Sequence, residues 1–161
     1  MNIKTAIRRI KKHRPKTYED FAEAGVPLEI ESLGEGVFRV VYRAHKLPLV
    51  VKFPLAGDGD DHTRSEVRRI KALSKYPKMR KYLPKVYYYD SRAGIVVMKY
   101  YPPMDKGFCE CGCGTATSLE RLAQNLVKDL TGMSLDDIHA GNVTTDTGQS
   151  NGRPIFLDLG Y

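Results

Sequence analysis

The sequence contains no tryptophan, only three cysteines, and no apolar run long enough to span a membrane. The cysteines are crowded into one CECGC segment, Cys109 to Cys113. An odd number of cysteines in one short segment does not suit a disulfide framework and is typical of a reducing compartment. The basic N-terminus also lacks the apolar core of a secretory signal. We therefore expect a cytoplasmic chain with no membrane partner.

The CECGC segment could also hold a metal, because alternating thiolates bind zinc or copper. A fourth ligand at a recognisable spacing is missing from the sequence, since His62 and His139 are both distant from the cysteines. We favour ordinary reduced thiols over a metal centre.

Charge is the strongest feature of the composition. Lys and Arg number 26 against 19 Asp and Glu, which gives a net charge of +7 over 161 residues. Basic side chains gather in residues 4–16 and 68–81. Such a balance favours acidic partners: nucleotide phosphates, nucleic acid or an acidic protein. We favour a solvated basic surface over nucleic-acid binding.

The hydrophobic pattern predicts mixed α and β structure. Apolar residues at helical spacing predict a basic amphipathic helix over 3–13, and Thr17-x-x-Asp20 resembles the capping box of a second short helix. Strands are expected in 28–45, 47–55, 85–90 and 95–101, with a helix over 63–75. A helix over 118–131 with Leu119, Leu122, Leu126 and Leu130 buried precedes a loop and two short strands.

Two glycines in the first predicted hairpin could approach a phosphate. In the segment LGEGVF, Gly34 and Gly36 lack the Cβ that would obstruct backbone N–H groups, and Phe38 could cap the loop. An ordinary glycine hairpin is the alternative, and it is the better explanation of this segment alone. Arg39 stands where a third glycine would complete a G-x-G-x-x-G loop.

Lys52 lies in the very apolar strand LVVKF. Strand alternation places Leu49, Val51 and Phe53 on one face, and Val50 with Lys52 on the other. A lysine there must extend its amine to solvent or find an anion.

Glu66 is a candidate partner for Lys52, because it lies one helical turn before Ile70 on the expected inward face. A competing interpretation takes Thr63-x-x-Glu66 as a capping box. A helix that starts near Asp60 or Asp61 would favour the ion pair, which we prefer.

The segment DDIHAGN supplies the strongest motif. Asp137 stands five residues before Asn142, which is the spacing between the base and the metal-binding Asn of the phosphotransferase catalytic loop. Asp136 stands six residues before Asn142 and does not fit this spacing. Asp158 follows the apolar PIFL and precedes Leu159-Gly160. Asn142 and Asp158 offer the oxygen ligands that Mg²⁺ prefers. A polar loop between helix and strand is the alternative for DDIHAGN, and the tripeptide Asp158-Leu159-Gly160 is a weak signal by itself.

Taken in this order, the motifs resemble the protein-kinase-like superfamily from about Leu33 to Gly160. The resemblance implies an ATP and Mg²⁺ site with a glycine-rich loop, a strand lysine paired with the helix glutamate, a catalytic base and two metal ligands. Met98 resembles the gatekeeper, and the hinge at Lys99–Tyr101, which includes Tyr100, would meet adenine through backbone groups.

Two departures point to a subgroup. Leu135 replaces the His of HRD, and His139 stands where protein kinases carry a catalytic-loop Lys, so the resemblance implies that His139 contacts the transferring phosphoryl group. The resulting DIHAGN is similar to the DLHPGN of aminoglycoside-type phosphotransferases. LGEGVFRVVYR and VVKF resemble short kinase-like proteins of tailed phages, the group that we favour.

The resemblance implies an α+β protein-kinase-like fold, with an antiparallel N-lobe sheet plus helix C and a truncated C-lobe. We expect a basic helical segment at 1–27, the N-lobe at 28–101 and a minimal C-lobe with the catalytic loop and DLG motif at 102–161. The sequence ends one residue after Gly160, so it has no counterpart of the activation segment, the APE motif or the later helices.

The expected activity is ATP-dependent phosphoryl transfer to an alcohol, with Ser/Thr of a protein, such as a host protein, as acceptor. Two alternatives stay open. One is a pseudokinase-like module that binds nucleotide or a partner without catalysis, and the other is a small-molecule kinase of the aminoglycoside type.

Overall fold

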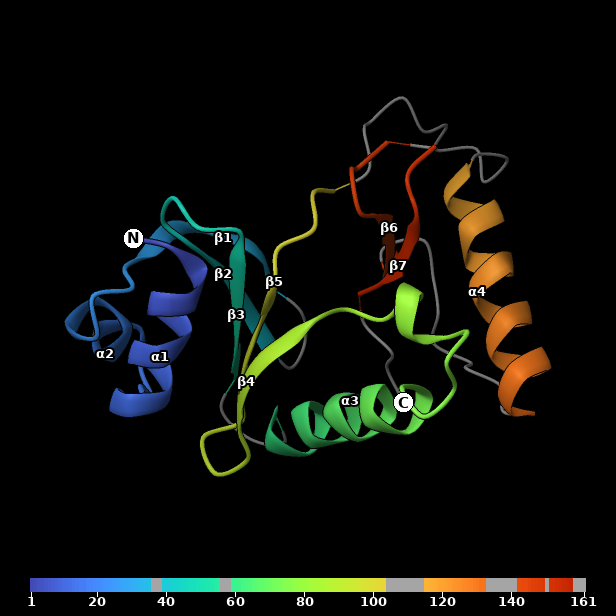
Figure 1. Cartoon of the computed structure of the whole chain (residues 1–161). Helices are drawn as coiled ribbons and strands as arrows, with labels where there is room; N and C mark the ends of the chain where they lie inside the picture. Colours follow the sequence, from blue (N-terminus) through green and yellow to red (C-terminus); the bar gives the residue numbers. More distant parts are fainter. Residues whose placement is uncertain (36–38, 56–58, 104–114, 133–141, 150, 158–161) are drawn as a thin grey trace. The chain divides into compact units, whose positions relative to one another are not determined.

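The computed structural model describes residues 1–35, 39–55, 59–103, 115–132, 142–149 and 151–157 (Figure 1). The chain divides into two compact units. The first comprises Met1–Arg64 and Lys85–Tyr100, and the second comprises Ser65–Pro84 and Tyr101–Tyr161. Within the described ranges, none of the helices is long and apolar enough to cross a membrane.

The first unit is built on an antiparallel sheet of five strands in the order β1-β2-β3-β5-β4. Its described elements are α1 (Ile3–His13), α2 (Tyr18–Glu23), β1 (Leu28–Glu35), β2 (Arg39–Ala44), β3 (Leu49–Pro54), β4 (Val86–Asp90) and β5 (Ile95–Lys99). Helix α3 (Gly59–Leu73) links β3 to the second unit.

Helix α1 spans the range that its sequence predicts, and α2 begins where its sequence predicts. The Asn2 side chain accepts a hydrogen bond of 2.9 Å from the Thr5 N–H at the start of α1. Arg14 ends α1 in a left-handed conformation (φ 49°), directly before Pro15. The predicted capping box of α2 is confirmed, since Thr17 Oγ1 accepts from the Asp20 N–H and the Asp20 carboxylate accepts from the Thr17 N–H.

One face of this sheet forms the core of the first unit. Tyr42, Leu49, Val51, Ile95 and Val97 alternate onto this face and pack with four buried residues of the N-terminal segment: Ala6, Ile10, Phe21 and Val26. Figure 1 shows α1 and α2 on one side of the sheet. The predicted alternation along β3 is therefore confirmed: Leu49, Val51 and Phe53 face the helices, and Val50 and Lys52 point away from them.

The second unit contains the remainder of α3, η1 (Arg80–Tyr82), α4 (Thr115–Thr131), β6 (Val143–Thr145) and β7 (Pro154–Phe156). Strands β6 and β7 form an antiparallel hairpin, and α4 packs against β6. The Tyr82 and Phe156 rings stack with their centroids 5.6 Å apart, which joins η1 to the hairpin.

The predicted apolar stripe of α4 is only partly right. Leu119 is buried, but Leu122 is 39% exposed, while Ala123 and Val127 are fully buried. The buried row thus advances in steps of four residues from Leu119. Leu126 and Leu130 are half-buried, so the predicted leucine stripe lies beside the most deeply buried row and not on it.

The predicted fold class is confirmed. The chain is α+β, with a five-stranded antiparallel sheet whose third strand leads into a helix and whose remaining two strands follow that helix. This is the order of elements that the kinase resemblance implies for the N-lobe.

Candidate functional site

The register of the sheet places Gly34 and Lys52 in one row. Gly34 on β1 lies opposite Val41 on β2, Val41 lies opposite Lys52 on β3, and Lys52 lies opposite Val96 on β5. Residues directly opposite one another share a face of an antiparallel sheet. Two of the predicted phosphate-binding residues, Gly34 and Lys52, therefore lie on the same face, two strands apart.

Lys52 is buried on this face. It is only 8% exposed, although its ammonium group would normally seek water. Val50 and Met98 form the next row, and Met98 is 2% exposed. The face opposite α1 and α2 thus combines apolar side chains with one buried cation, a composition suited to a ligand with an apolar ring and an anionic tail.

The segment predicted to be the hinge is held by backbone hydrogen bonds. The Lys99 N–H donates to the Lys85 carbonyl oxygen, and the Tyr100 N–H donates to the Pro48 carbonyl oxygen, each at 2.9 Å. These two amides already have acceptors inside the protein. If Tyr100 contacts adenine through its backbone, we expect its carbonyl oxygen to make that contact.

Arg43 is a residue of this face that the sequence pattern did not single out. It lies opposite Val50 on β3, and its guanidinium carbon is 4.3 Å from the centroid of the Tyr100 ring. A cation at this distance is attracted to the ring face. Arg43 lies two residues beyond Val41, so strand alternation places both on one face. That this is also the face of Lys52 follows from the register of β2 with β3, which the sequence does not give.

Glu66 lies inside α3, and only 2% of it is exposed. The helix begins at Gly59, so Thr63 occupies an interior position and cannot be the N-cap. The capping-box interpretation of Thr63 and Glu66 is therefore wrong. A buried carboxylate needs a partner of opposite charge or several donors, and the pairing of Glu66 with Lys52 stays a prediction.

The hairpin of the second unit fixes the backbone of Asn142. Asn142 directly precedes β6, and its carbonyl oxygen accepts a hydrogen bond of 2.7 Å from the N–H of Leu157, which directly follows β7. This bond extends the pairing of Val143 with Phe156 by one position. Asn142 thus lies across the hairpin from the residue that precedes Asp158 in the sequence.

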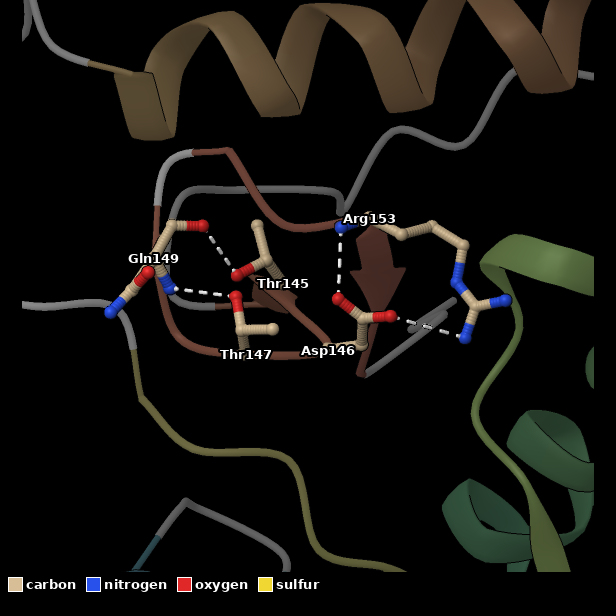
Figure 2. Close-up of polar contacts among 5 residues, drawn as sticks. All are labelled: Thr145, Asp146, Thr147, Gln149 and Arg153. Carbon is tan, nitrogen blue, oxygen red and sulfur yellow. Dashed lines mark hydrogen bonds and ion pairs between the residues drawn. The ribbon is translucent and has the colours of Figure 1, made fainter.

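The other end of this hairpin is closed by side chains, as Figure 2 shows. The Thr145 hydroxyl donates to the Gln149 carbonyl oxygen at 2.7 Å, and the Asp146 carboxylate accepts from the Arg153 N–H at 2.9 Å. Asp146 also pairs with the Arg153 guanidinium at 3.4 Å. These bonds fix the turn between two strands of only three residues each, and so help to hold Asn142 beside Leu157.

Several predicted site residues lie outside the described residues: Gly36, Phe38, Asp137, His139, Asp158 and the three cysteines of CECGC. The roles assigned to them stay predictions. Within the ranges that the structure describes, no group of three or more His, Cys, Asp or Glu is placed to hold a metal ion.

Comparison with known proteins adds little to this geometry. No protein-family model and no curated protein matches the chain. Among solved structures, the chain is similar to APH(2″)-IIa in a ternary complex with streptomycin and ATP, with 19% sequence identity and a TM-score of 0.46. The match covers 70% of this chain and 37% of the other, so the chain spans little more than a third of that protein. A likeness at this level decides neither fold nor function.

Proposed function

We propose that this chain is a kinase-like phosphotransferase that binds ATP with Mg²⁺ and transfers the γ-phosphoryl group to an alcohol. One observation carries the proposal: Gly34 and the buried Lys52 share a row on the sheet face that α1 and α2 do not cover. With strands about 4.8 Å apart, their backbones are separated by roughly 10 Å, which a lysine side chain and a phosphate chain can bridge together.

In this proposal most of the nucleotide contacts come from residues of the first unit, whereas Glu66 belongs to the second. Lys52 neutralises phosphate charge and Glu66 orients its ammonium group. Backbone N–H groups at Gly34 and Gly36 approach the phosphate oxygens, and Phe38 covers them. Adenine lies against Met98, with the backbone of Tyr100 beside it.

Asn142 and Asp158 are the proposed Mg²⁺ ligands, and their donor atoms fit the ion. Mg²⁺ takes hard oxygen ligands, which an amide and a carboxylate provide. The 2.7 Å bond between Asn142 and Leu157 supports the pairing, because Asp158 is joined covalently to Leu157. When bound, the ion neutralises charge on the phosphate oxygens.

Asp137 is the proposed base. It orients the acceptor hydroxyl and takes its proton while the new oxygen–phosphorus bond forms and the bond from the γ-phosphorus to the ADP oxygen breaks. His139 contacts the transferring phosphoryl group. Positioning and charge stabilisation then account for most of the rate enhancement. We take protein Ser/Thr as the acceptor.

Transfer of labelled phosphate tests this proposal. The full chain is incubated with Mg²⁺ and γ-labelled ATP, alone, with a generic protein acceptor, and with an aminoglycoside. We expect label on the protein acceptor and a loss of about 100-fold or more in Asp137→Asn. Asp129→Asn, the same change at an exposed position of α4, provides the control and should keep full activity.

The other outcomes separate the remaining hypotheses. Label on the aminoglycoside alone would assign a small-molecule kinase. ATP-dependent thermal stabilisation without transfer to any acceptor would leave a binding module. If ATP caused neither thermal stabilisation nor phosphoryl transfer, the proposal would be overturned entirely.

A further inference from the structure

A groove runs along α1 on the first unit, on the helix-covered side of the sheet. Its volume is about 400 Å³, and it is lined by Ile3, Lys4, Ile7, Arg8, Lys11 and Tyr87. Ile3, Ile7 and Tyr87 are partly buried against the core, so they form an apolar floor. Lys4, Arg8 and Lys11 are exposed and form the rim. Among the described residues, the lining therefore contains three cations and no carboxylate.

Tyr87 reaches the groove because of an irregularity in β4. Val86 pairs with Met98 and Tyr88 pairs with Val97, so the register shifts between them and Tyr87 is the additional residue. Such a bulge redirects a side chain out of the strict alternation of a strand. Both Tyr87 and Tyr88 consequently pack against the same core cluster. Burial raises the pKa of the Tyr87 phenol, in keeping with its place in the floor.

The charge of α1 is of one sign along its whole length. The helix carries Lys4, Arg8, Arg9, Lys11 and Lys12 without an acidic residue. Of these cations, Lys4, Arg8 and Lys11 line the groove. Arg9 instead donates to the Gly25 carbonyl oxygen at 3.5 Å.

We propose that this groove binds an acidic peptide segment of a partner protein, with an aliphatic side chain on the floor and Asp or Glu side chains on the rim. Isoleucines suit an aliphatic anchor, and the three cations complement flanking carboxylates. The floor fits a nucleic acid less well. Base stacking needs an open aromatic face, but the Lys85 ammonium lies 5.1 Å from the centroid of the Tyr87 ring, which also packs on the core.

This inference does not depend on the proposed phosphotransfer. The groove lies on the side of the sheet occupied by α1, whereas Lys52 and Met98 point to the other side. Loss of ATP binding would leave the peptide site intact, and the converse also holds.

Fluorescence polarisation with defined probes tests the groove. The probes are labelled decapeptides with a central Ile-Leu pair and zero, two or four flanking Glu residues, a version of the four-Glu peptide with Ser-Ser at its centre, and a decamer of oligo-dT. We expect affinity for the full chain to rise with each pair of Glu residues and to fall at least tenfold with Ser-Ser.

Two charge reversals on α1 locate the binding. Arg8→Glu changes the rim, and Lys12→Glu makes a comparable change at an exposed position outside the groove. We expect about a tenfold loss of peptide affinity in Arg8→Glu and less than threefold in Lys12→Glu, with both variants melting like the wild type. Amide NMR shifts caused by the peptide should cluster at α1 and Tyr87.

Three results would overturn the proposal. One is that no decapeptide binds at 1 mM. Another is that the two charge reversals weaken binding equally, which would indicate general electrostatic attraction. The third is that oligo-dT binds more tightly than every peptide, which would assign the groove to nucleic acid.

Discussion

Gly148 illustrates how single residues hold the hairpin of the second unit. It has a positive φ of 74°, and a Cβ at this position would lie 2.8 Å from the Pro103 carbonyl oxygen. Gly132, which follows α4, has a similar φ of 70°, but among the described residues no atom lies within 4 Å of its would-be Cβ. A side chain at Gly132 would therefore meet backbone strain alone, whereas one at Gly148 would meet both backbone strain and steric conflict.

We predict that Gly148→Ala lowers the free energy of unfolding by about 3 kcal/mol and Gly132→Ala by about 1 kcal/mol. The difference reflects the conflict with Pro103. Urea unfolding of both variants measures it. Equal losses would show that the hairpin turn does not pack closely on Pro103.

Asp20 makes stability depend on pH. The Lys16 N–H, which donates to its carboxylate at 2.8 Å, is the main cause that lowers the pKa of Asp20 below 3.8, and the Thr17 N–H adds to it. A carboxyl whose pKa is lowered on folding stabilises the protein above its unfolded pKa. That contribution is lost as the pH falls through the folded pKa.

In the wild type, the melting temperature should fall below about pH 4 as Asp20 becomes protonated. We predict that this fall is less steep in Asp20→Asn, because the variant has no ionised carboxyl to lose. Glu19→Gln removes a neighbouring carboxyl from the same turn and should leave the slope close to that of the wild type. A slope unchanged by Asp20→Asn would contradict the role given to the capping box.

At the scale of elements, α3 contains an unsatisfied polar atom. Thr63 is fully buried, and its hydroxyl oxygen has no hydrogen-bond partner within the described part of the chain. Thr144 on β6 is buried to a similar extent, but its hydroxyl donates to the Pro102 carbonyl oxygen at 2.7 Å. Valine has nearly the same shape as threonine, so it removes the hydroxyl and little else.

We predict opposite effects from the two substitutions. Thr63→Val should stabilise the chain by about 1 kcal/mol, because it removes a desolvated hydroxyl. Thr144→Val should destabilise it by about 1–2 kcal/mol, because the Pro102 carbonyl loses its donor. Chemical denaturation compares them, and destabilisation by Thr63→Val would mean that its hydroxyl is hydrogen-bonded in solution.

Elements were predicted well wherever local chemistry decides them. The spacing of Ile3, Ile7 and Ile10 predicted α1, and the Thr17–Asp20 pair predicted the start of α2. The helix predicted over 63–75 starts four residues too late, because α3 begins at Gly59. The stripe of α4 was misplaced because the sequence does not reveal which neighbouring surface the helix meets.

Which residues lie side by side in the candidate site was harder to predict than the helices and strands that carry them. Lys52 was found because a cation in an apolar strand is conspicuous, but its alignment with Gly34 depends on two register shifts in β1. If the pairing of Leu28 with Ala44 continued without them, position 38 would lie opposite Gly34 in place of Val41. Bulges of this kind follow from packing in the folded sheet and leave little trace in a single sequence.

At the scale of the whole molecule, the account predicts that nucleotide binding depends on the metal. ATP should raise the melting temperature in Mg²⁺, and EDTA should remove most of that rise. Asn142→Ala should lose the Mg²⁺-dependent part of this rise, because it removes a proposed ligand oxygen and keeps the backbone bond to Leu157. Asn151→Ala, at an exposed position of the same hairpin, should behave like the wild type.

Calorimetric titration of ATP at fixed Mg²⁺ into the wild type, Lys52→Met and Lys46→Met tests the central claim most directly. Lys52 is buried on the face of the sheet opposite α1 and α2, whereas Lys46 is exposed in the turn between β2 and β3. The account predicts saturable binding that weakens at least tenfold in Lys52→Met, because a charge-assisted contact is lost, and changes less than twofold in Lys46→Met. Equal affinities for ATP in all three proteins, or no binding to the wild type, would contradict it.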